Sequence, residues 1–336
     1  MKNILIFIVL ISSGVYAQVG GENIYTFLNL TGSSRQAALG GKAITLIDDV
    51  NQPTWNPSVI NQGLENQFSL NYLNYLSDIA LVSASYGHLI NRNVGVVHSN
   101  ISYLNYGSFI SADEEGNETG SFKAYDLSFS LGYAYNFKGS DFHLGGNIKF
   151  INSVIENYSS YGIGADLGLL YFNENKPYAI TLVVRNFGVQ IKAYDDTKED
   201  LPLEVDLGAS YKLENVPITW HVTLDNLQQW DISVSNPSNA TTNIDGETTE
   251  EEISFLNNAF RHLSFGAELF PEKGFNLRFG YNIRRSKELF LTDKRTFAGF
   301  TAGFGIKINK LKFNYAFSKF HPASNSSTFS LLVNLN

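Results

Sequence analysis

Apolar and polar side chains alternate along most of this chain. From Tyr125 to Phe137, every odd-numbered residue is large and apolar or aromatic, and every even-numbered residue is small or polar. Because successive side chains of a β-strand point to opposite faces of the sheet, this pattern predicts a strand with one wholly apolar face. Alternation of this kind divides the chain into fourteen predicted strands. They cover residues 66–74, 78–90, 93–106, 122–137, 141–152, 160–172, 178–191, 202–213, 217–229, 260–270, 274–285, 296–309, 311–319 and 327–335.

The lengths of these segments distinguish between two all-β folds. Strands of a soluble β-sandwich average about 5–6 residues, whereas a strand needs about 9–11 residues to cross the hydrocarbon core of a membrane at its tilt. Several segments exceed ten residues, and their polar faces are rich in Gly, Ser, Asn and Ala rather than in charged residues. An even number of strands is typical of bacterial outer-membrane barrels. The sequence therefore favours an all-β fold, a transmembrane antiparallel β-barrel of about 14 strands, over a soluble sandwich.

The connections between the predicted strands alternate in length. Every second connection is a short turn, such as residues 91–93 and 138–140. Most of the others are longer. These longer connections are residues 107–121, 192–201, 231–259, 286–295 and 320–326. Short periplasmic turns and long outer loops are typical of outer-membrane barrels, so we expect both chain ends on the periplasmic side.

The first residues have the layout of a secretory signal peptide. Lys2 is the only charged residue before Glu22, residues 4–11 are an apolar run, and small and polar residues lead to Ala17. The apolar run is shorter than the roughly 20 residues that a membrane-spanning helix needs. We therefore predict a signal peptide at residues 1–17 and export to the outer membrane.

Residues 18–65 lie between the signal peptide and the first predicted strand and lack clean alternation. They contain two Gly-Gly pairs, a candidate helical turn at residues 35–39 and two prolines within residues 51–58. A barrel of 14 strands is wider than one that its own side chains fill. We expect residues 18–65 to fold into the lumen as an N-terminal plug, with residues 66–336 forming the barrel. The alternative is a periplasmic tail.

Candidate chemistry changes this interpretation little. The formal net charge of −8 argues against nucleic acid as a partner. The chain has no cysteine, and its six histidines show no paired metal-binding spacing. A Gly-x-Ser-x-Gly nucleophile motif is also absent from the sequence. We therefore expect a non-enzymatic protein with no catalytic residues, no metal and no other cofactor.

Charged residues on the predicted inner faces are nearly balanced in sign. The alternation turns five acidic and seven basic side chains toward the lumen. They are Asp126, Asp166, Asp206, Asp225, Glu268, Lys149, Arg185, Lys212, Arg278, Arg284, Lys307 and Lys312. A selective pore would more often show one dominant sign. We expect a salt-bridged lumen that holds the plug, with Arg185, Arg278 and Arg284 as structural candidates; the alternative is a path for an acidic ligand.

Several motifs resemble the PorV/PorQ family of outer-membrane proteins, which belong to the FadL-like class of barrels. The N-terminal motif is SRQAALGG at residues 34–41, followed by Asp48-Asp49 and by WNPS at residues 55–58. Later motifs are RNFG at 185–188, LP at 201–202 with GASY at 208–211, and FGY at 279–281. Together they span the chain after the signal peptide, and the rather short chain and single long loop resemble the PorQ branch more than the PorV branch.

This resemblance implies a component of the type IX secretion system that anchors or docks proteins of the cell-surface attachment complex. The partners it implies are PorZ-like and sortase-like proteins and a PorV-like barrel, besides outer-membrane lipid. Arg35, Asn56 and Pro57 match the family's hatch motif, where the resemblance implies a structural role. The FadL-like class also implies an alternative, a transporter of long-chain fatty acids or other hydrophobic molecules. A surface hydrolase built on a barrel and a soluble secreted adhesin are more distant alternatives.

Overall fold

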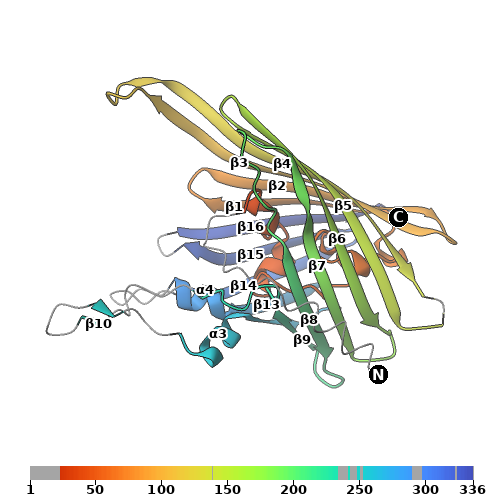
Figure 1. Cartoon of the computed structure of the whole chain (residues 1–336). Coiled ribbons are helices and arrows are strands. Elements are labelled where there is room, and N and C mark those ends of the chain that lie inside the picture. The colour runs from red at the N-terminus through yellow and green to blue at the C-terminus, as the bar shows by residue number, and fades with distance from the viewer. Residues whose placement is uncertain are drawn as a thin grey trace, which may run out of the picture.

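Fourteen antiparallel strands form a closed barrel in the computed structural model, as the sequence predicts (Figure 1). The structure describes residues 23–137, 139–233, 241–242, 248–249, 253–289, 297–321 and 324–335. Strands adjacent in the chain pair with each other around the ring, and β1 closes it by pairing with β16. The barrel strands are β1 (Gln67–Leu76), β2 (Ile79–Asn91), β3 (Gly95–Ala112), β4 (Glu118–Asn136), β5 (Phe142–Ile155), β6 (Tyr158–Phe172), β7 (Tyr178–Lys192), β8 (Glu204–Lys212), β9 (Ile218–Leu224), β12 (Leu263–Leu269), β13 (Phe275–Asn282), β14 (Phe300–Ile308), β15 (Leu311–His321) and β16 (Ser324–Asn334). The two-residue strands β10 (Thr241–Thr242) and β11 (Thr248–Thr249) form a separate small sheet.

The barrel is polar inside and apolar outside. Along β4, the outward side chains of Phe129 and Leu131 are 39% and 45% exposed, while Ser128 and Ser130 are buried on the inner face. Exposed large apolar side chains recur on the outer face of every strand pair around the ring. A soluble protein rarely exposes a continuous apolar surface of this kind. The fold is that of a transmembrane β-barrel, whose outer face lies against lipid.

The two ends of the barrel differ. One end carries the β2–β3, β4–β5, β6–β7, β8–β9, β12–β13 and β14–β15 turns together with the start of β1 and the end of β16; we call it the turn end. The other end carries three long connections, between β7 and β8, between β9 and β12 and between β13 and β14, and we call it the loop end. Its other connections are short, with two residues each between β1 and β2, β5 and β6, and β15 and β16. The alternation of connection lengths predicted from the sequence therefore holds only in part, because the long connection predicted at residues 320–326 is two residues long. The two chain ends of the barrel lie at the turn end.

Strand lengths vary strongly around the ring. β3 and β4 have 18 and 19 residues, whereas β9 and β12 have seven each. Figure 1 shows the β3–β4 hairpin projecting past its neighbours at the loop end. The loop predicted at residues 107–121 is therefore wrong in part, because only residues 113–117 fall outside the two strands. A register shift between Asn105 and Ser108 interrupts the alternation there, so the period of two does not carry through.

Residues 23–66 precede β1 and lie inside the barrel; we call them the plug. Their short helical elements are η1 (Thr26–Asn29), α2 (Ser34–Ala38), η2 (Gln52–Thr54), η3 (Pro57–Val59) and η4 (Gln62–Leu64). α2 packs against β14, β15 and β16, and η3 packs against β4, β5 and β6. The plug thus spans the lumen from one wall to the other. The predicted signal peptide and the first residues of the predicted plug lie outside the described residues.

Two further helices, α3 (Phe255–Arg261) and α4 (Ile283–Glu288), lie at the loop end. The strand predicted at residues 274–285 ends earlier, at Asn282, because the Asn282 side chain accepts a hydrogen bond from the Arg285 backbone N–H and caps α4. Arg284, predicted on the inner face of that strand, therefore lies in a helix. Within the described part of the chain, no helix is long and apolar enough to cross a membrane.

Candidate functional site

The plug lies so close to the barrel wall that several wall positions hold only glycine. A methyl group on Gly145 of β5 would overlap the Pro57 carbonyl group and the Ser58 amide of the plug. A methyl group on Gly280 of β13 would overlap the Gly40 amide in the same way. β5 and β13 lie nearly opposite each other in the ring. The missing side chains on two facing walls therefore make the space that the plug backbone occupies.

An ion-pair cluster joins the plug to the wall through Glu268 of β12. Arg35 of α2 donates two hydrogen bonds to the Glu268 carboxylate, from Nε at 3.1 Å and from Nη2 at 2.7 Å. Arg278 of β13 donates to the same carboxylate from Nε at 2.7 Å. All three side chains are at least 95% buried. The remaining Arg35 nitrogen, Nη1, contacts Asp48 at 2.7 Å, so the arginine bridges two plug segments and the wall.

A second cluster surrounds Trp55 of the plug. Lys42 of the plug lies 3.0 Å from the Glu204 carboxylate of β8, and Arg185 of β7 pairs with both Glu204 and Asp206. The Arg185 guanidinium also lies 3.9 Å from the centre of the Trp55 ring. Stacking on an indole stabilises a cation that is removed from water. Oppositely charged side chains of the plug and the wall pair with each other here, as they do around Glu268.

A third cluster fixes the wall near the start of the plug. Lys149 of β5 contacts the Asp166 carboxylate and the Asn186 side-chain oxygen, both at 2.8 Å. Asn186 has a backbone φ of 58°, and its amide N–H donates to Asp166. The Asn186 side chain also donates to Asn29 of η1 at 3.0 Å. The bulge at Asn186 thus turns one wall side chain toward both the plug and the buried lysine.

Asn56 and Pro57 organise the middle of the plug. The Asn56 side chain donates to the Ile44 carbonyl at 2.8 Å and to the Thr181 hydroxyl of β7 at 3.0 Å, and its oxygen accepts from the Ser58 amide at 3.0 Å. Pro57 begins η3 directly after it, at a position where a missing N–H leaves no bond unmade. Of the residues that match the hatch motif, Arg35 and Asn56 hydrogen-bond the wall and Pro57 packs on it at Gly145.

The six residues predicted as hatch and lumen candidates divide into two groups. Arg35, Asn56, Pro57, Arg185 and Arg278 all lie at the plug–wall interface. Arg284 lies in α4, where it pairs with Glu288 of the same helix at 3.8 Å and is also close enough to Asp225 to interact with its charge. Lys212 and Lys307, also predicted to point inward, are exposed at the turn end. The sequence did not single out Lys42, because the plug has no period from which to read a facing direction. Glu204 was missed although it lies in the strand predicted at residues 202–213, where its even position matches that of the inward Asp206.

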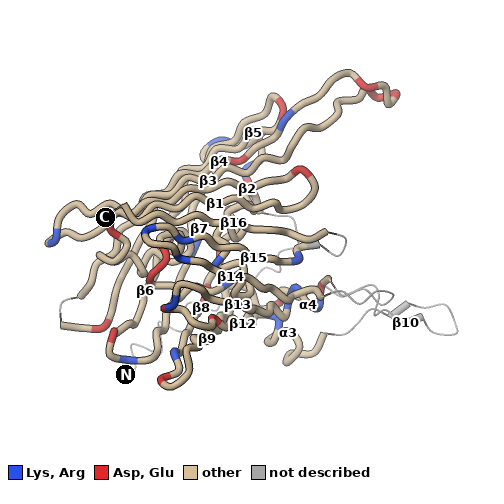
Figure 2. The backbone as a smooth tube through the Cα atoms, turned by 180° about the vertical axis from the view of Figure 1, so that it is seen from behind, with Lys and Arg blue, Asp and Glu red and all other residues tan. Residues whose placement is uncertain are grey.

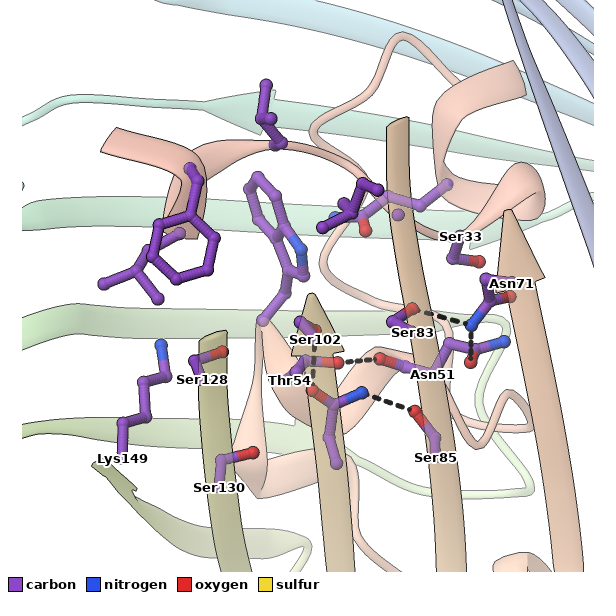
Figure 3. Close-up of a pocket in the computed structure, with 18 residues that line it drawn as sticks. Ser33, Asn51, Thr54, Asn71, Ser83, Ser85, Ser102, Ser128, Ser130 and Lys149 are labelled. Atoms are coloured by element: carbon purple, nitrogen blue, oxygen red, sulfur yellow. Dashed lines mark hydrogen bonds between the residues drawn. The ribbon is translucent and has the colours of Figure 1, made fainter. Parts of the chain in front are cut away.

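A small cavity separates the plug from the inner faces of β1 to β5 (Figure 3). Phe27 and Trp55 of the plug form part of its apolar side. Its polar side carries wall hydroxyl and amide groups, and Asn71 there donates to Asn51 of the plug at 2.8 Å. The cavity volume is about 50 Å³, which is room for a few water molecules, whereas pockets for drug-sized ligands measure about 300–1,000 Å³.

Larger hollows open at the two ends of the lumen. A hollow of about 490 Å³ lies between β7, β8 and η1 at the loop end. Two others, of about 350 and 400 Å³, lie around Asp48 and Glu174 at the turn end. Carboxylate and amide groups share their lining with apolar side chains such as Ile47 and Phe172.

Comparison with known proteins shows which solved structures have a similar fold. No protein-family model matches the chain, and no curated protein sequence is similar enough to count as a relative. The structure of the toluene transporter TbuX from Ralstonia pickettii is similar with a TM-score of 0.50 and 11% identity, covering 91% of this chain and 98% of the transporter. The Acinetobacter baumannii outer membrane protein Omp33 gives a TM-score of 0.39 and 7% identity, covering 82% of this chain and 100% of that one. The chain therefore has the fold of an outer-membrane β-barrel, similar to that of the toluene transporter.

Proposed function

We propose that this protein is a non-enzymatic outer-membrane component of the type IX secretion system that docks partner proteins of the cell-surface attachment complex. The observation that carries the proposal is the occupied lumen, in which buried ion pairs and close backbone contacts hold the plug to the wall. A barrel filled in this way offers its loop end, rather than its interior, to other molecules. The PorV/PorQ-like motifs supply the kind of partner: PorZ-like and sortase-like proteins and a PorV-like barrel.

The loop end offers a surface suited to docking on the β3–β4 hairpin. Residues 107–122, which we call the arm, extend beyond the last pairs made with β2 and β5. Within the arm, the Phe109 and Phe122 rings stack with their centres 5.2 Å apart, and Ile110 is 66% exposed. Unpaired strand edges and exposed apolar side chains are features that protein partners bind.

The tip of the arm is acidic and ordered. Figure 2 shows acidic residues gathered at the far end of the projecting hairpin. The Asn117 side chain and backbone N–H groups donate to the Asp113 carboxylate and hold its pKa below its usual range, so the carboxylate stays charged. An acidic tip above an apolar stem favours a partner with a basic rim around an apolar patch.

The test is to purify the tagged protein from its own outer membrane in mild detergent and to identify its companions by mass spectrometry. We expect PorZ-like and sortase-like secretion proteins with the unaltered chain, and their loss with the double variant Phe109→Ser, Phe122→Ser. Val216→Ser, at an exposed apolar position of the turn end, is the matched control and retains them. A barrel that purifies without any secretion protein contradicts the proposal.

A second candidate function is transport of hydrophobic molecules, and the likeness to the toluene transporter supports it more directly than it supports docking. The cavity beside Phe27 and Trp55 is where an apolar ligand would begin to enter, after the plug had shifted. Organic extracts of the purified protein test this candidate. A fatty acid or other apolar molecule, present at near one per barrel and lost in Trp55→Ala, would establish transport in place of docking.

A further inference from the structure

α3 shows a pattern of burial that is the reverse of a helix on a water-soluble surface. Phe255, Leu256 and Phe260 are 68%, 66% and 54% exposed. The polar side chains of Asn258 and Arg261, on the other face of the same helix, are only 5% and 3% exposed. A surface helix in water turns its apolar face to the protein interior. α3 does the opposite, as a helix does when its surroundings are apolar.

The polar face of α3 is fixed toward the protein by hydrogen bonds. The Asn258 side chain donates to the Trp230 carbonyl oxygen and accepts from the Ser233 hydroxyl. Ser254 caps the first turn by accepting from the Asn257 amide. The helix also packs against α4. These contacts set the direction in which the apolar side chains point.

The position of α3 in the barrel explains why an apolar outer surface is needed there. α3 leads directly into β12, and Figure 2 shows it in line with β9 and β12 at the edge of the barrel. β9 and β12 have seven residues each. A strand needs about 9–11 residues to cross the hydrocarbon core. The apolar surface of these two strands therefore ends short of the membrane boundary, and α3 continues it.

An aromatic cluster marks the outer limit of this extended surface. The Trp230 ring stacks on Phe255 with ring centres 4.7 Å apart and on His262 at 5.4 Å. Trp230 itself is 46% exposed. Tryptophan is enriched where a membrane protein passes from hydrocarbon to water, because one part of its ring system is apolar and its N–H is polar.

We propose that α3 is a membrane-inserted element whose Phe255, Leu256 and Phe260 side chains lie among the lipid acyl chains of the leaflet at the loop end. The helix completes the lipid-facing surface above β9 and β12. Its occupant is lipid, because the exposed face of α3 continues the lipid-facing face of the barrel and its polar face is already bound to the protein. This proposal does not depend on whether the barrel docks secretion proteins or transports small molecules.

The absence of cysteine from the chain allows a direct test. A nitroxide spin label is attached to Leu256→Cys in the otherwise unaltered protein, reconstituted in phosphatidylcholine–phosphatidylglycerol vesicles. Frequent collision of the label with oxygen indicates that it lies in lipid, and frequent collision with a water-soluble nickel chelate indicates that it lies in water. Leu131→Cys, on the lipid-facing side of β4, and Glu115→Cys, in the arm tip, are the two reference positions. A gel-mobility shift on heating verifies that each labelled barrel is folded.

We expect the ratio of oxygen to nickel collisions at position 256 to match that at 131 and to exceed that at 115 severalfold. A ratio like that at position 115 places α3 in water and overturns the proposal. Shielding of position 256 from both reagents also overturns it, because it shows that protein, such as a second copy of the chain, covers the helix instead of lipid.

Discussion

Glu268 is a wall side chain that attaches directly to the plug. It accepts hydrogen bonds from Arg35 of the plug and from Arg278 of the neighbouring strand, with all three groups buried. A buried carboxylate between two arginines has both of its oxygens satisfied, and loss of either arginine leaves charge without full compensation. The attachment is therefore sensitive to single substitutions.

Replacement of Arg35 by alanine is expected to destabilise the protein and to loosen the plug. Breaking a buried ion pair costs about 3–5 kcal/mol, and the remaining Arg278 keeps the loss near the lower value. The measurements are the thermal unfolding midpoint and the ion conductance in planar bilayers. Arg92→Ala, which breaks an exposed pair with Glu65, costs about 0–1 kcal/mol and is the control. Equal behaviour of the two variants contradicts the role given to Arg35.

Two adjacent glycines of β5 allow a test of the close plug–wall contact. Gly145 faces the plug backbone, whereas a methyl group on Gly146 would meet its nearest neighbours, the Asp166 carbonyl oxygen and the Leu167 side chain, at 3.6 Å. Gly145→Ala is expected to lower the free energy of unfolding by about 1–3 kcal/mol through overpacking. Gly146→Ala should be nearly neutral. A neutral Gly145→Ala would mean that the plug backbone moves away from β5 at little cost.

At the scale of single elements, the arm extends beyond the last residues of β3 and β4 that pair with the neighbouring strands of the wall. β2 pairs with β3 only as far as Asn105, and β5 pairs with β4 only from Ala124. Replacing residues 107–122 by an Asn-Gly turn is therefore expected to leave the thermal unfolding midpoint unchanged, because such a turn suits a two-residue hairpin. A clear drop in the midpoint would show that the arm contributes to barrel stability.

Element boundaries show where sequence reasoning succeeds and where it stops. The fourteen predicted strands all exist, because a lipid outer surface and a polar interior impose a strict period of two. The arm was predicted as a loop because both of its faces meet water, which removes that constraint. The last residues of the strand predicted at 274–285 form α4, where the Asn282 cap, a local hydrogen bond, overrides the pattern. The contacts of the plug depend on how closely its backbone approaches the wall. The only sign of this close approach in the sequence is the glycines at wall positions.

At the scale of the whole molecule, we expect the plug to determine whether the barrel conducts ions. A ring of 14 strands is wider than its own inward side chains fill. We expect the intact protein to show no stable conductance in planar bilayers, and a variant lacking residues 23–65 to form an open pore. Both are measured at the same voltage and salt concentration. A conducting intact protein would contradict a lumen closed by the plug and would favour transport.

The pairing of β1 with β16 has a consequence for biogenesis. This seam joins Gln67 to Asn334, the two ends of the barrel portion of the chain, so it is the most non-local contact in the wall. The plug precedes β1 and touches nearly opposite walls through positions where no side chain fits. A closed barrel whose wall fits the plug backbone this closely leaves no room for an already folded plug to enter. We therefore expect the wall to form around the plug, with the pairing of β1 and β16 made last, so that the plug guides assembly of the barrel as well as filling it.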